Sequence, residues 1–158
     1  MAKFAADTSV SSERSLMEIK QTVTRYGAQG FAYMETTQAA MVQFDAQGFR
    51  VRFVVPLPDR NASEFRLTPA RRTVRTKDQQ LAAWEQAGRQ RWRALALVIK
   101  AKLEAVESGI TEFQSEFLAH IVLPNGQTVG EWAIPQVDRA YETGTMPPLL
   151  PMHGEGSK

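Results

Sequence analysis

The longest regular pattern of apolar residues lies between Leu81 and Val106. At about 100° per residue, eight positions of this segment fall within roughly a third of a helical circumference. They are Leu81, Trp84, Gly88, Trp92, Leu95, Ile99, Leu103 and Val106. A second face is rich in alanine, and a third carries cations. The pattern predicts one helix from about Thr76 to Ser108, with a stripe that faces the core.

The predicted helix is long for a chain of this size. At 1.5 Å per residue it would measure roughly 45–50 Å, whereas the radius of gyration of a compact domain of this length is about 15 Å. Either the helix bends near Gly88 or its amino-terminal turns project from the fold. A bend is favoured because glycine costs about 1 kcal/mol within a helix. The alanine-rich face would pack on other elements of the same chain or on a second copy, and we favour the first arrangement.

Shorter patterns precede this helix. Ser15 and Glu18 have capping-box spacing, and apolar residues then recur at steps of three and four, which predicts a helix from about Ser11 to Tyr26. From Gly30 to Leu57 the period becomes two, as in strands of a half-buried antiparallel sheet. Three strands are predicted, at about 31–34, 40–44 and 49–55, with a hairpin turn at 45–48.

Residues 59–77 follow neither period and form a predicted long basic loop. They hold six of the eleven Lys and Arg residues found between positions 50 and 93. Compact domains seldom contain about 20 residues without secondary structure unless the segment has a function or is disordered. The pattern does not choose between a binding segment and a disordered connection.

Two further capping-box spacings follow Gly109, which is placed to end the long helix. Thr111 with Gln114 and Thr128 with Glu131 each open an apolar periodic segment and predict a short helix. The second helix contains a proline at position 135, which would kink or split it. A hairpin around residues 119–126 is an alternative to the first helix.

The two ends of the chain lack the periodic apolar patterns of its centre. Residues 1–10 are a predicted flexible leader, and residues 146–158 a proline-rich strap with a disordered end. The 158-residue chain suits one domain, placed at residues 11–145. It has no cysteine, no apolar run near the roughly 20 residues of a membrane span, and no apolar core of a signal peptide at its start. We expect a soluble protein of the cytoplasm.

Charge is unevenly distributed along the chain. The net charge is +2, but residues 1–49 sum to −1, residues 50–93 to +7 and residues 94–158 to −4. Basic surfaces bind phosphate backbones with release of counterions, so the central region is the candidate for nucleic-acid contact. A solvated basic loop beside an acidic lobe of the same molecule is the competing interpretation.

Sequence motifs of enzymes are absent. There is no GxGxxG, Walker, GxSxG or HExxH motif, and His120 and His153 are the two histidines. His120 lies in an apolar segment, which favours a structural role. We therefore predict no catalytic residue, no cofactor and no metal site. Four glutamates leave Mg²⁺ binding open, although their spacing equally fits a solvated helix face: Glu104, Glu107, Glu112 and Glu116.

The candidate nucleic-acid-binding residues are cations of the predicted third strand, the basic loop and the basic face of the long helix. They are Arg50, Arg52, Arg71, Arg72, Arg75, Lys77, Arg89, Arg93 and Lys100. Tyr33 or Trp84 could add base stacking. Trp84, however, lies on the apolar stripe, which favours packing in the core. No zinc finger, recognition helix or RNP motif accompanies these charges.

Three segments carry a resemblance to known proteins: Trp92 to Ile110, Glu116 to Trp132, and Met146 to Pro151. The amino-acid sequences of these segments resemble those of small proteins encoded by bacteriophages and prophages. The resemblance implies expression in an infected bacterium and a role in replication or recombination, or in binding a host factor. It transfers no catalytic residue.

These patterns together predict one α+β domain. It comprises an N-terminal helix, a three-stranded antiparallel sheet, a long central helix, short C-terminal helices and a proline-rich tail. The predicted function is a non-enzymatic, phage-derived accessory protein that binds nucleic acid, with DNA as the expected partner. The alternative is a module that binds a host protein and inhibits or redirects it, with homo-oligomerisation as an option. A membrane partner is not expected.

Overall fold

The computed structural model describes residues 5–146 of the chain. The elements follow one another as α1 (Ser12–Arg25), β1 (Gly30–Glu35), β2 (Ala39–Ala46), β3 (Phe49–Pro56), α2 (Ser63–Arg66), α3 (Lys77–Glu107), α4 (Phe113–Phe117), the 3₁₀ turn η1 (Leu118–His120) and α5 (Val129–Thr143). The predicted α+β class and the order of its main elements are confirmed. The predicted proline-rich tail lies outside the described residues, except for Met146.

The three strands form an antiparallel sheet in the order β1-β2-β3. A two-residue turn joins β2 to β3, and its residues Gln47 and Gly48 have φ values of +50° and +82°. Positive φ at both positions matches the twist of the flanking strands, and glycine adopts it without strain. The resulting register aligns Phe31, Phe44 and Val51 in one row across the sheet.

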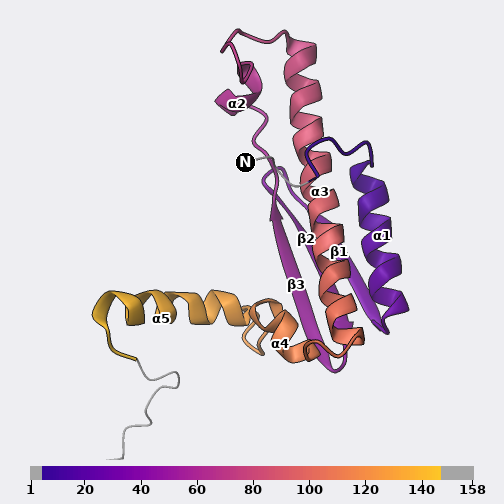
Figure 1. Ribbon diagram of the computed structural model, residues 1–158, viewed down its shortest axis with the longest axis vertical. Coiled ribbons are helices and arrows are strands. Elements are labelled where there is room, and N and C mark those ends of the chain that lie inside the picture. Colours follow the sequence, from indigo (N-terminus) through magenta and orange to yellow (C-terminus); the bar gives the residue numbers. More distant parts are fainter. Residues whose placement is uncertain (1–4, 147–158) are drawn as a thin grey trace, which may run out of the picture.

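Helices α1 and α3 cover this apolar face of the sheet (Figure 1). The buried core combines residues from α1, the sheet, α3 and α4: Ile19, Val23, Val42, Phe44, Val51, Phe53, Trp92, Ile99, Leu103, Phe113 and Phe117. The ring of Phe117 packs edge-on against Phe44 and Phe53, with centroid distances of 6.0 and 6.3 Å. Segment α4 therefore closes the lower end of the core, although it has only five residues.

The predicted bounds of α1 are confirmed, because Ser11 and Tyr26 are its two cap residues, but the predicted capping box is not formed. Ser11 is the N-cap, and its hydroxyl accepts a hydrogen bond from the backbone N–H of Arg14. Ser15, predicted to cap the helix with Glu18, instead lies inside the helix and is buried. Spacing alone could not choose between the two serines, because both precede an apolar periodic segment.

Helix α3 continues without interruption through Gly88, and its amino-terminal turns extend past the sheet (Figure 1). The predicted bend is therefore wrong, and the alternative, a projecting end, is observed. Thr76 and Gln79 form a reciprocal capping box at the start of the helix. A Cβ atom on Gly88 would meet no atom within 4 Å, so this glycine is not required by a close contact.

The segment after α3 agrees with the prediction only in part. The Thr111 cap is wrong, because Glu112 precedes α4 and no side chain caps that helix. The hairpin alternative describes the next residues better, since bridges join Val51 to Ile121 and Val122 to Thr128.

The second predicted helix after Gly109 is present as α5. Thr128 and Glu131 form the predicted capping box at its start. The helix continues through Pro135 and ends at Gly144, where φ is +66°, so the prediction that proline splits it is wrong. Figure 1 shows α5 extending away from the sheet, with only its first part near the body of the molecule.

The described part of the leader, residues 5–10, has contacts that the sequence did not predict. The Gln86 side-chain amide of α3 donates to the carbonyl oxygens of Ala6 and Thr8, at 2.8 and 3.0 Å. These bonds place the leader beside α3. Among the described helices, none combines the length and apolar character that crossing a membrane requires.

Candidate nucleic-acid interface

The tip, defined as residues 59–77, lies beside the amino-terminal turns of α3 (Figure 1). The sequence predicts a loop without regular structure, but the tip contains the short helix α2 and an antiparallel bridge between Leu67 and Val74. Phe65 of α2 is 5 % exposed and anchors the tip against α3. The prediction of a structureless loop is therefore wrong, because one buried ring and a local bridge give the tip a defined shape.

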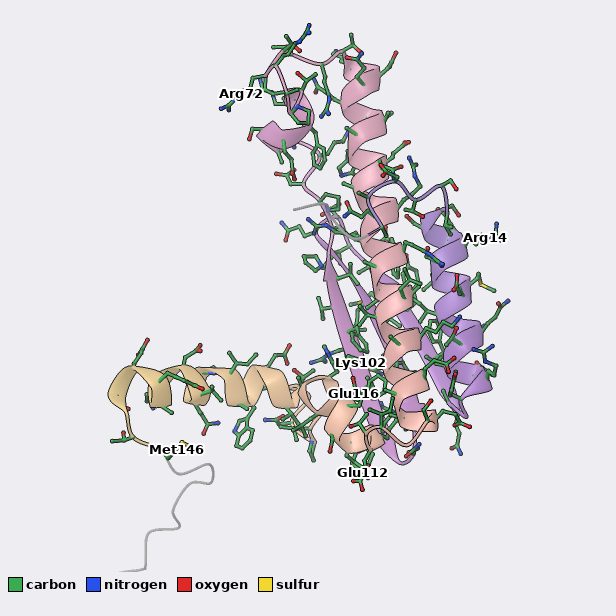
Figure 2. The ribbon with its side chains drawn as sticks, in the orientation of Figure 1. Arg14, Arg72, Lys102, Glu112, Glu116 and Met146 are labelled. Atoms are coloured by element: carbon green, nitrogen blue, oxygen red, sulfur yellow. The ribbon has the colours of Figure 1, made fainter. Side chains whose placement is uncertain are left out.

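A tight turn carries two arginines at the end of the tip. The hydroxyls of Thr68 and Thr73 lie 2.8 Å apart across this turn, and the Thr68 N–H donates to the Thr73 carbonyl at 2.9 Å. Arg72 has a φ of +50°, a left-handed conformation that costs a non-glycine residue about 1 kcal/mol. Its side chain points away from the body (Figure 2). The turn thus presents Arg71 and Arg72 to solvent.

Four cations of the tip have exposed side chains with no hydrogen bond or ion pair to any described residue: Arg66, Arg71, Arg72 and Lys77. Three of them, Arg71, Arg72 and Lys77, belong to the predicted site. Arg66 was missed as a site residue, although it is one of the six cations of the basic segment. Its carbonyl accepts the Arg75 N–H at 2.9 Å, which joins the two sides of the tip at this residue.

The remaining cations of the tip hold its structure together. Arg75 donates from Nη1 to the carbonyl of Glu64 at 3.0 Å, at the C-terminal end of α2, where free carbonyls favour a cation. The guanidinium of Arg60 lies 5.8 Å from the centre of the Trp84 ring. Arg75, a predicted binding residue, therefore has a structural contact within the tip, and its role in binding stays a prediction.

The two predicted arginines of β3 lie on the sheet face opposite the helices, away from the tip cations. Arg50 forms a two-bond ion pair with Asp45 at 2.9 and 3.1 Å, and this hydrogen bonding lowers the pKa of Asp45. Arg52 donates from Nη2 to the carbonyl of Gly126 and to Glu131. Both arginines already have carboxylate partners within the molecule, so they do not belong to the unpaired cations of the candidate interface.

The predicted cations of α3 also separate from the tip. Arg89 donates two hydrogen bonds to the Gln86 side chain at 3.0 and 2.7 Å, and Arg93 forms an ion pair with Glu18 of α1. Lys100 is exposed. It lies roughly 35 Å from Lys77 along the helix, at 1.5 Å per residue. The nine predicted residues therefore do not form one surface.

The aromatic residues proposed for base stacking are both engaged within the protein. The Trp84 indole N–H donates to the Pro58 carbonyl at 2.7 Å. The Tyr33 ring lies 5.8 Å from that of Trp92, and its hydroxyl donates to Glu35. Burial, followed by this carboxylate, raises the pKa of Tyr33 to about 12. The tip therefore offers charge rather than a stacking platform.

His120 and two of the glutamates considered for Mg²⁺ binding, Glu104 and Glu116, each contact another side chain of the protein. The His120 ring stacks on Phe53 at 4.0 Å, and burial is the largest of the effects that lower its pKa. Lys102 donates to the Glu116 carboxylate at 2.9 Å, whereas Glu112 lies apart from this pair (Figure 2). Glu104 hydrogen-bonds Tyr26 and raises the pKa of that phenol. Across residues 5–146, no group of three or more acidic or histidine side chains is arranged to hold a metal ion.

The geometry of the tip is thus that of an exposed basic surface with an ordered backbone. No family model, curated protein or solved structure matches this chain.

Proposed function

We propose that the protein binds nucleic acid through the tip, as a non-enzymatic accessory protein of a phage or prophage. The observation that carries the proposal is the group of four exposed, unpaired cations on one ordered turn and its flanks: Arg66, Arg71, Arg72 and Lys77. Cations free of internal partners can release counterions from a phosphate backbone without first breaking an ion pair.

The distribution of acidic residues also favours the tip as the end of the molecule that faces nucleic acid. Between residues 104 and 146, the chain carries seven Asp and Glu residues and one Arg. This acidic region includes α4 and α5, at the end of the molecule opposite the tip (Figure 1). A charge distribution of this kind steers the basic end toward a polyanion and the acidic end away from it.

The contacts expected are with phosphates, since the nearby aromatic rings are engaged. We therefore expect binding without base preference, to double-stranded as well as single-stranded DNA. Each phosphate contact contributes about 0.9 to the slope of log affinity against log salt for duplex DNA. A surface of four cations predicts a slope of about −3 to −4.

The experiment is a fluorescence-anisotropy titration of labelled DNA between about 50 and 200 mM salt. The test variant combines Arg71→Gln, Arg72→Asn and Lys77→Gln, with asparagine chosen because it tolerates positive φ. The control combines Arg14→Gln, Lys20→Gln and Lys100→Gln, three exposed cations outside the tip. Because both variants lose three charges, a general effect of net charge would affect them equally.

We expect the tip variant to lose most of the affinity and to reduce the salt slope by about 3. The control should change both quantities much less. A wild-type protein that forms no salt-sensitive complex with either DNA would reject the proposal, as would equal losses in the two variants. The first outcome would favour the second candidate function, a protein-binding module, for which the exposed apolar residues of α5 are the supporting observation.

A further inference from the structure

The sheet has an apolar surface on the face that α1 and α3 leave uncovered. Alternation along the strands places the residues between the buried positions on this face. Met34, Met41 and Val54 form one cross-strand row, and Ala39 pairs with Pro56 beside it. Met34 is 54 % exposed and Val54 57 %. These five residues, called the sheet patch, contain no charge.

Helix α5 carries a second exposed apolar surface. Ile134, Val137 and Tyr141 follow one another at steps of three and four and therefore share one face of the helix. They are 58, 49 and 88 % exposed. Acidic residues of the same helix, Asp138 and Glu142, lie next to this sequence pattern. An amphipathic helix of this kind normally buries its apolar face against a partner.

The start of α5 is fixed to the body, which prevents the helix from covering the sheet patch of its own chain. Arg52 of β3 bonds both the Gly126 carbonyl and Glu131, and the Val51–Ile121 bridge holds the preceding segment. From these anchors α5 extends away from the sheet (Figure 1). Laying α5 on its own sheet would require breaking these bonds.

We propose that α5 of a second copy of this chain packs on the sheet patch. The sizes match, because Ile134 to Tyr141 span about 10 Å along the helix and the row of Met34, Met41 and Val54 spans about 10 Å across the three strands. The charges are also complementary. Arg91 donates to the Pro56 carbonyl at the border of the patch, and the basic tip begins at Asp59, whereas α5 supplies Asp138 and Glu142.

The arrangement is reciprocal, because each copy offers one α5 and one sheet patch. Two copies related by a twofold axis would bury both pairs of surfaces and form a closed dimer. This interface does not use the tip turn, so it is compatible with nucleic-acid binding and goes beyond it. Loss of one property by mutation need not remove the other.

The absence of cysteine from the chain allows a direct test of proximity. Val54→Cys and Val137→Cys proteins are prepared separately, mixed in equal amounts and treated with a short bismaleimide. We expect a cross-linked dimer in the mixture and little from either protein alone. Ile110→Cys, at an 80 % exposed position outside both surfaces, replaces either partner as the control.

Light scattering after size exclusion gives an independent measure. We expect a dimer for the wild type and a monomer for Val54→Glu and Val137→Glu, with Ile110→Glu unchanged. Circular dichroism verifies that each variant is folded, and the cysteine assay, with its smaller substitutions, decides the outcome if one is not. A wild-type monomer at about 100 μM would overturn the proposal. Cross-linking of Val137→Cys to itself as readily as to Val54→Cys would also overturn it, because α5 would then pair with α5.

Discussion

Nη2 of Arg52 on β3 lies 3.1 Å from the Glu131 carboxylate in the first turn of α5, although 79 positions separate the two residues. The same nitrogen donates to the Gly126 carbonyl at 2.9 Å. One side chain from the sheet therefore binds both the turn before α5 and the capping residue at its start. This contact sets the direction in which α5 leaves the body.

Arg52→Ala is expected to loosen the attachment of α5. Loss of the charged hydrogen bond to the Gly126 carbonyl should lower the free energy of unfolding by about 1–2 kcal/mol. Amide exchange should accelerate in the turn at 123–128 and in the first turn of α5, as measured by hydrogen–deuterium exchange. Arg50→Ala is the matched control, because its ion pair with Asp45 is largely exposed and should matter less. Equal effects of the two substitutions would contradict the assigned role of Arg52.

Two helical glycines should respond oppositely to alanine. At Gly130, a Cβ atom would meet the Ala119 carbonyl oxygen at 2.8 Å, so Gly130→Ala should destabilise the protein by about 1–3 kcal/mol. At Gly88, nothing lies within 4 Å, so Gly88→Ala should stabilise α3 by about 0.5–1 kcal/mol. Urea unfolding of both variants beside the wild type measures the difference. A stable Gly130→Ala protein would mean that η1 and α5 are not in the described contact.

The free energy of unfolding should decrease as the pH is lowered from 7.5 to 5.5, because of His120. Its pKa in the folded state lies below the ordinary value of 6.5, chiefly through burial and then through the charge of Lys102, against an opposing backbone hydrogen bond. The unfolded chain therefore takes up a proton more readily as pH falls through 6.5, which favours unfolding.

His120→Phe should retain the stacking on Phe53 and remove this part of the pH dependence. Urea unfolding at the two pH values tests the prediction, since both values lie above the ordinary pKa of carboxylates. An equally steep loss of stability in the wild type and the variant would show that other groups are responsible.

Arg75 and Arg72 should have different roles within the tip. Arg75→Gln removes the hydrogen bond to the Glu64 carbonyl and should accelerate amide exchange in α2 and the following bridge by about tenfold, for a bond worth about 1.4 kcal/mol. Arg72→Asn should leave exchange in α2 unchanged, because its side chain has no described partner, and should weaken only DNA binding. Identical exchange profiles for the two variants would contradict this division.

Much of the fold could be predicted because local patterns and local energetics agree. The alternation around Arg50 and Arg52 identified β3, and the pair Gln47-Gly48 closes the predicted hairpin. The Thr128 capping box was predicted correctly, since the two residues that form it are three positions apart. Phe65, however, gave no periodic signal, because a four-residue helix is shorter than the windows in which periodicity can be recognised.

The candidate site was predicted less well than the fold. The sequence showed that the cations concentrate between residues 50 and 93. It could not show which of them would form ion pairs with carboxylates in the folded protein. Arg93 meets Glu18, and Arg52 meets Glu131, only because the helices and strands that carry them pack together. Arg71 and Arg72 remained in the site because a turn at the end of the molecule has few neighbours.

The sequence by itself determined the α+β class, the three strands and the long helix, because these depend on the spacing of apolar side chains within about 30 residues. Tertiary structure decided which charges are free, that the amino-terminal turns of α3 project, and that α5 leaves the body with Ile134 and Tyr141 exposed. Those properties depend on contacts between residues far apart in the chain, whose energies a local pattern does not contain.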